Sequence, residues 1–137
     1  MANIDFSKLV TLEQKTLAAR EAVLAQLADL RWQRETGGIV FAKGQMMSTS
    51  RESQMQVANL HQSLEAGLLD LPVLWKFDAG WVALSSDQVK QMAKAVNAHV
   101  RQCFAAEKEV FDRVQAAKSP YEIDLAMAFE LAYQAAE

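Results

Sequence analysis

The stretch that decides the fold is Gly37-Gly38-Ile39-Val40-Phe41-Ala42-Lys43-Gly44-Gln45-Met46-Met47-Ser48. Its paired glycines reach positive φ without steric cost, and such residues commonly end helices. Two short β-prone runs then flank Lys43-Gly44, a pattern that predicts a tight hairpin. The chain is therefore expected to change from helix to strand within this stretch.

Helices are predicted on both sides of this hairpin. Upstream, apolar positions recur in steps of three and four and predict a helix over about residues 11–35. Downstream, Thr49 and Glu52 form a capping-box pattern at the start of a second helix, which Pro72 ends. The upstream stripe consists mainly of apolar residues, namely Leu9, Leu12, Thr16, Ala19, Val23, Leu27 and Leu30.

The order of a hairpin followed by a helix recurs further along the chain. Residues 73–77 and 81–84 predict a second hairpin. We expect one face of it to carry four side chains, those of Trp75, Phe77, Trp81 and Ala83.

Two further helix starts follow the second hairpin. Ser85 and Gln88 form a capping-box pattern for a long helix that reaches about Lys118. The segment Ser119-Pro120-Tyr121-Glu122 combines a cap, a proline in the first turn and a following acid, and predicts the start of a last helix.

Together these elements predict an α+β fold in the order α-ββ-α-ββ-α-α, with two β-hairpins forming a small antiparallel sheet packed against long helices. A chain of 137 residues has the usual length of a single domain. We expect a leading helix segment over 1–19, an α+β core over 20–118 and a C-terminal helix over 119–137. The apolar stripes of the long helices are longer than so narrow a sheet, which spans only ~20 Å. They are expected to pack on each other or on a second subunit, which makes a homo-oligomer through the long helices one expectation.

Composition excludes several classes of protein. The net charge of −3 and the pI of about 5.4 argue against a nucleic-acid partner. No window approaches the ~20 apolar residues of a membrane span, and Met1–Val10 lacks the cationic start and apolar core of a secretory signal. Cys103 is the single cysteine, which fits a reducing compartment.

The sequence contains no convincing catalytic or metal-binding constellation. His99 and Cys103 stand at i and i+4, but zinc needs at least three protein ligands and His61 has no partner spacing. We therefore expect Cys103 to be packed in the core beside a partly buried His99. No enzyme activity, cofactor or metal is predicted.

The candidate binding residues are tryptophans and arginines, which are enriched at interface hot spots. Each tryptophan has two interpretations, a core side chain or an anchor for a partner. The basic cluster of Arg31, Arg34, Lys43 and Arg51 is interrupted by Glu35 and Glu52, so it fits either a phosphate site or surface ion pairs. The predicted partner-binding residues are Arg31, Trp32, Arg34, Arg51 and Trp81.

Four blocks carry a family resemblance: 30–38, 49–54, 75–84 and 95–104, which include Arg31-Trp32, Glu35-Thr36-Gly37-Gly38, Arg51-Glu52-Ser53-Gln54, Gly80-Trp81 and His99. Over about residues 20–118 the chain resembles a domain of unknown function found in tailed bacteriophages and prophages. The resemblance implies a setting among tail genes, often near tail fibres or their assembly proteins, and no established catalytic activity. Many relatives carry this region at the end of a longer protein. The last helix lies outside the resemblance.

The resemblance leads us to expect a phage tail accessory protein that binds a tail-fibre or baseplate protein as a chaperone during assembly. One alternative is a structural component retained in the virion at the tail tip, fibre or baseplate. Another is a small phage factor that binds a host protein. The expected location is the bacterial host cytoplasm during infection, or the virion tail under the structural alternative.

Overall fold

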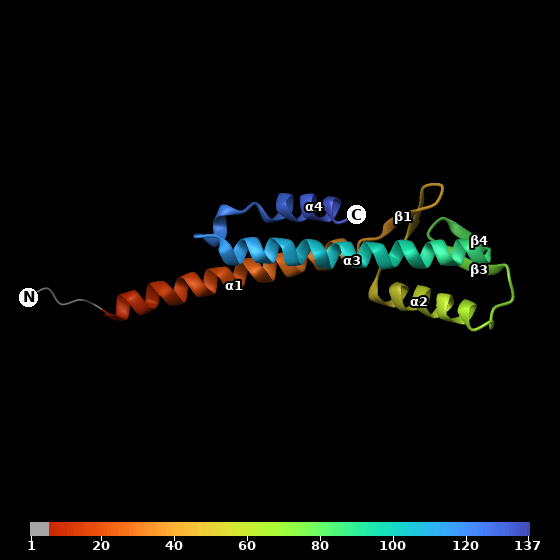
Figure 1. Ribbon diagram of the computed structural model, residues 1–137, viewed down its shortest axis with the longest axis horizontal. Helices are drawn as coiled ribbons and strands as arrows, with labels where there is room; N and C mark the ends of the chain where they lie inside the picture. Colours follow the sequence, from red (N-terminus) through yellow and green to blue (C-terminus); the bar gives the residue numbers. More distant parts are fainter. Residues whose placement is uncertain (1–5) are drawn as a thin grey trace, which may run out of the picture. The chain divides into compact units, whose positions relative to one another are not determined.

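The computed structural model describes residues 6–137, and within its first helix the side chains of residues 7–10 lie outside the description. The start of the predicted leading segment, residues 1–5, therefore lies outside the described residues. The elements follow the predicted α+β order (Figure 1): α1 Phe6–Thr36, β1 Ile39–Phe41, β2 Gln45–Met47, α2 Arg51–Glu65, β3 Val73–Phe77, β4 Gly80–Leu84, α3 Ser86–Ala116, the 3₁₀ turn η1 Pro120–Glu122, and α4 Leu125–Ala135. The prediction of two hairpins and long helices is confirmed.

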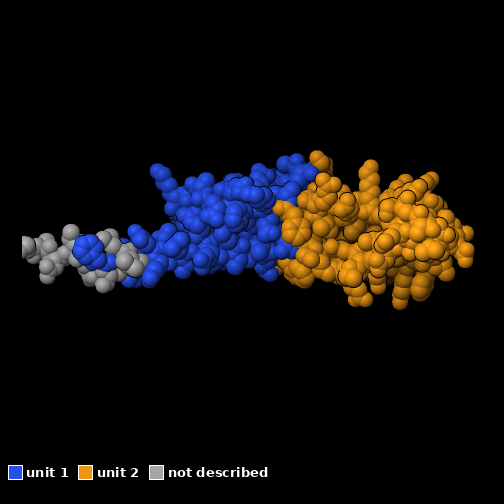
Figure 2. Space-filling model, turned by 60° about the horizontal axis from the view of Figure 1, so that its bottom comes forward, with its two compact units in different colours: residues 1–31, 105–136 blue, residues 32–104, 137 orange. Residues whose placement is uncertain are grey.

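The chain divides into two compact units (Figure 2). The first takes its described residues from Met1–Arg31 and Ala105–Ala136, and the second consists of Trp32–Phe104 with Glu137. Both α1 and α3 contribute residues to each unit. The expectation of a single domain over 1–137 stays a prediction.

The first unit is a helical core built from α1, α3 and α4. Its buried residues are Val23, Leu27, Ala106, Val110, Val114, Ala128, Phe129 and Ala132. Arg20 of α1 donates to the carbonyl oxygens of Val114 and Ala117 near the end of α3. These last carbonyls lack partners within their own helix, so the guanidinium satisfies them and ties α1 to α3.

The last helix begins later than expected. Ser119 does cap a turn, since its side chain accepts from the Tyr121 N–H, but Pro120–Glu122 forms only a 3₁₀ turn. Ile123 then adopts an extended conformation, and Asp124 caps α4 by accepting from the Met127 N–H at 3.2 Å. The predicted start at Ser119 was therefore wrong by about one and a half turns.

The second unit packs both hairpins and α2 against α3. Its buried core consists of Met47, Val57, Phe77, Leu84, Val89, Met92 and Val96. The hairpins are hydrogen-bonded as two separate two-stranded antiparallel sheets, where the sequence argument expected one small sheet. An aromatic contact joins them, because the rings of Phe41 and Phe77 stack with centroids 6.3 Å apart.

The face assignment in the second hairpin was wrong for two of its four residues. Phe77 pairs with Gly80 across the turn, which places Lys76 opposite Trp81 and Trp75 opposite Val82. Directly opposed residues share a face, and neighbours along a strand alternate between faces. Trp75 and Phe77 therefore point inward, whereas Trp81 and Ala83 point outward.

The predicted helix caps had mixed outcomes. The Ser85–Gln88 capping box is confirmed, with the Ser85 N–H 2.8 Å from Gln88 Oε1 and the Gln88 N–H 3.2 Å from Ser85 Oγ. The Thr49–Glu52 box was wrong. Ser50 is the N-cap of α2 and its hydroxyl accepts from the Ser53 N–H at 3.1 Å. The Thr49 hydroxyl is engaged elsewhere.

Candidate functional site

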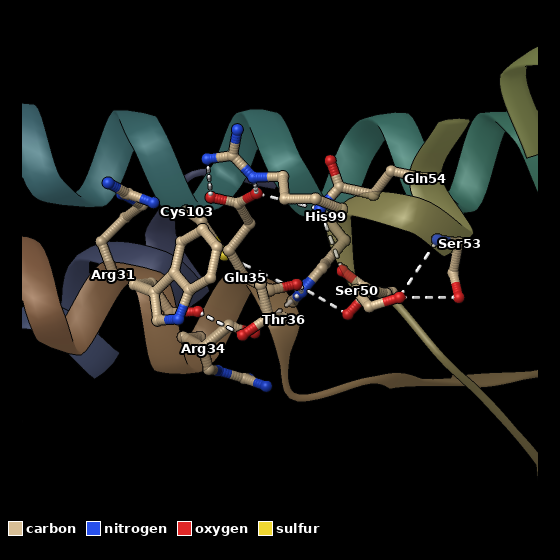
Figure 3. Close-up of polar contacts among 12 residues, drawn as sticks. Arg31, Arg34, Glu35, Thr36, Ser50, Ser53, Gln54, His99 and Cys103 are labelled. Carbon is tan, nitrogen blue, oxygen red and sulfur yellow. Dashed lines mark hydrogen bonds and ion pairs between the residues drawn. The ribbon is translucent and has the colours of Figure 1, made fainter. Parts of the chain in front are cut away.

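A buried carboxylate lies at the centre of the polar residues singled out by the sequence (Figure 3). Glu35, in the last turn of α1, is 0% exposed. Its Oε1 accepts from Arg51 Nη2 at 3.0 Å and its Oε2 accepts from Gln54 Nε2 at 2.9 Å. Both donors come from the first turn of α2. A buried charge is tolerated only when it is paired and hydrogen-bonded, so this carboxylate fixes the start of α2 against the end of α1.

Thr49 joins the end of α1 to the loop that follows it. Its buried hydroxyl donates to the Glu35 carbonyl at 2.6 Å and accepts from the Gly38 N–H at 2.8 Å. Residue 37 must be glycine, because a Cβ there would lie 2.8 Å from the carbonyl oxygen of Gln33. Gly38 adopts φ +93°, a region that favours glycine. The Glu-Thr-Gly-Gly block thus has a structural role.

His99 satisfies the same helix end from the side of α3. The residue is 2% exposed, and its Nε2 lies 3.0 Å from the Arg34 carbonyl and 3.2 Å from the Glu35 carbonyl. Both partners are acceptors, so Nε2 carries the proton and donates. Burial lowers the pKa of His99 below its usual 6.5, although the two backbone hydrogen bonds act in the opposite direction. We name the set Glu35, Thr49, Arg51, Gln54 and His99 the Glu35–His99 cluster.

The prediction that Cys103 is packed in the core beside His99 is confirmed, and His99 is more buried than expected, at 2% exposed. Cys103 is 0% exposed and its Sγ lies 3.9 Å from His99 Nε2. Within the described part of the chain, no group of three or more His, Cys, Asp or Glu residues could hold a metal ion. Nor is any described helix long and apolar enough to cross a membrane.

The five predicted binding residues do not form one site. Trp32 and Arg51 come together, with the guanidinium 5.2 Å from the ring centroid and the tryptophan 46% exposed. Arg31 belongs to the first unit, where its Nε lies 3.0 Å from Glu107 Oε1. Arg34 is half-buried, and its backbone carbonyl accepts from His99.

Trp81 lies on the outward face of the second hairpin. It is 67% exposed, and Lys76 Nζ lies 5.8 Å from its ring centroid. Leu74 is exposed on the same face. On the first hairpin, Val40 and Met46 stand directly opposite each other and are also exposed. We call these two surfaces the outer hairpin faces.

The Glu35–His99 cluster was missed because its members were assigned separate roles, with Thr49 predicted as a helix cap and His99 as a partly buried neighbour of Cys103. Glu35 seemed to interrupt a basic patch, whereas it is the buried partner of one arginine in that patch. With Arg31 paired to Glu107 as well, the arrangement favours ion pairs over a phosphate site. The available signal was that Glu35, Gln54 and His99 all fall within the blocks that carry the resemblance.

The fold is α+β, and its first long helix ends on a buried polar network. Residues 18–132 match the family described as a domain of unknown function, DUF4376, and the chain belongs to this family. The resemblance to a family of unknown function is thus confirmed, and the match extends beyond 20–118 into α4. No curated protein and no solved structure matches the chain.

Proposed function

We propose that this protein is a non-enzymatic bacteriophage tail accessory protein that binds a tail-fibre or distal-tail protein during assembly, in the manner of a chaperone. The observation that carries the proposal is the exposure of large apolar side chains on the outer hairpin faces. Leu74, Val40 and Trp81 are each about two-thirds exposed. Clusters of this kind mark surfaces that bind other proteins.

Trp81 has the properties of an interface anchor. Tryptophan supplies a large contact area at a small cost in side-chain entropy and is enriched at binding hot spots. The ammonium of Lys76 lies near its ring and adds a positive charge at the edge of the apolar surface. Such a face suits an apolar partner surface bordered by acidic groups.

The use of the polar residues also supports binding over catalysis. His99 Nε2 is engaged with two backbone carbonyls, and the Cys103 thiol is fully buried. The Glu35 carboxylate is held by Arg51 and Gln54. These groups maintain the fold, and in this arrangement none is presented to a substrate.

The proposal is tested by co-expressing the protein with tail-fibre and distal-tail proteins and measuring complexes by size exclusion with light scattering. We expect a co-eluting complex that Trp81→Ala weakens. The matched control is Met55→Ala, which removes an equally exposed side chain from α2. A complex indifferent to Trp81→Ala would remove the assigned face, and the absence of any complex would remove the proposed function.

Mass spectrometry of purified virions then distinguishes the alternatives. A chaperone is absent from the finished particle, whereas a component of the fibre, tip or baseplate is retained. Recovery of one host protein in stoichiometric amount, with no tail complex, would favour a factor that binds a host protein.

A further inference from the structure

A groove between α2 and α3 in the second unit is separate from the outer hairpin faces. It has a volume of about 520 Å³. Apolar side chains from both helices form its floor, namely Val57, Ala58, Ala93, Val96 and Val100. A groove between two helices with an apolar floor is a common receptor for the apolar face of a third helix.

The rim of this groove is basic. Lys90 and Lys94 stand one turn apart on α3, and His61 lines the α2 side. Neither lysine forms an ion pair with any carboxylate of the described residues, whereas His61 lies 3.5 Å from Glu65. In a chain of net charge −3, two neighbouring lysines without acidic partners favour an occupant that combines apolar side chains with carboxylates.

The chain itself contains a helix of that kind. After Lys118 the sequence has no lysine or arginine, and its charged residues are Glu122, Asp124, Glu130 and Glu137. The inner face of α4 buries Ala128, Phe129 and Ala132. Its outer face exposes Met127 and Leu131, which stand at i and i+4 at 62% and 65% exposure. Glu130 lies between them and is also exposed.

We propose that the α2–α3 groove binds the outer face of α4 from a second copy of the chain. Met127 and Leu131 enter the groove, and Glu130, the single acidic residue of α4, faces Lys90 and Lys94. The groove and the outer face of α4 are different surfaces, so each contact is heterologous. Two copies that each dock the outer face of α4 in the groove of the other form a closed dimer. If the contact is made in one direction only, further copies can add and longer assemblies result.

Sedimentation velocity of the full chain over a range of concentrations tests this contact. We expect reversible self-association, with a dissociation constant that Lys90→Glu/Lys94→Glu raises by about tenfold or more. The matched control is Lys15→Glu/Lys43→Glu, which changes the net charge equally at exposed positions of α1 and of the turn between β1 and β2 and should leave association unchanged. Far-ultraviolet circular dichroism verifies that each variant folds.

A charge exchange makes the test specific for α4. Glu130→Lys/Gln134→Lys should also abolish self-association, because the outer face of α4 is then basic and is repelled by the basic rim of the groove. An equimolar mixture of this variant with Lys90→Glu/Lys94→Glu should associate again. In the mixture, the acidic groove of one variant binds the basic outer face of α4 of the other. A strictly monomeric wild-type protein, equal loss in the control variant, or failure of the mixture to associate would each overturn the proposal.

Discussion

Replacing Arg51 by methionine should destabilise the protein more than replacing its partner Glu35 by glutamine, although both changes break the same ion pair. The side chain of Glu35 is 0% exposed and that of Arg51 is 52% exposed. Arg51→Met keeps the carboxylate covered but leaves a buried charge without its ion-pair partner, which should cost about 3–5 kcal/mol. Glu35→Gln leaves a guanidinium that water can solvate, and the lost hydrogen bonds should cost only about 2 kcal/mol.

The assay is equilibrium unfolding in urea, followed by circular dichroism and tryptophan fluorescence. The change in the free energy of unfolding is taken from the midpoint shift at an unchanged denaturant slope. Arg101→Met, which removes an exposed arginine from α3, is the control and should shift stability by less than about 0.5 kcal/mol. If Glu35→Gln proved as costly as Arg51→Met, the burial of the carboxylate would not be the source of the effect.

Three further predictions concern other parts of the fold. Burial lowers the pKa of His99 in the folded state, so below its usual 6.5 the unfolded chain takes up a proton that the folded chain does not. The free energy of unfolding should therefore fall as the pH drops from about 7.5 towards the lowered pKa, and His99→Gln should flatten this dependence in urea titrations. Trp32→Ala should cost only about 1–2 kcal/mol, since the ring is 46% exposed and the guanidinium of Arg51 lies over it; a loss near that of a fully buried ring would contradict this. Leu27→Ala should cost about 2–5 kcal/mol in thermal or urea unfolding, while Leu12→Ala, at a 60% exposed position of the same helix, should be nearly neutral.

Local signals were sufficient to predict the order of the elements. Helical spacing located α1 and α3, and Gly37-Gly38 marked the end of α1. The prediction that Pro72 ends the second helix was wrong, because α2 ends at Glu65 and Gly67 follows its C-cap at φ +72°. Ser85 and Gln88 formed the predicted capping box because both partners lie within four residues of each other. Predictions of this kind succeed when every group they need is local in sequence.

Predictions that needed distant partners failed. Three hydroxyl residues, Ser48, Thr49 and Ser50, precede α2, and any of them is chemically able to cap it. Thr49 is excluded because its hydroxyl donates to the carbonyl of Glu35, which the sequence alone does not place nearby. The face assignment in the second hairpin failed for another reason. It depended on the pairing register, and a shift of one residue in the register moves every side chain to the other face.

The Glu35–His99 cluster gives a structural explanation for three of the four blocks that carry the resemblance. Glu35 and His99 lie 64 positions apart in the sequence and meet in one buried network. A block explained by internal hydrogen bonds identifies a fold and leaves the partner unspecified. Trp81 belongs to the remaining block but is exposed, and its side chain has no such role in the interior. Under the proposed function, substitutions should therefore begin at Trp81 and the outer hairpin faces, because Glu35 and His99 are buried and would alter binding by altering stability.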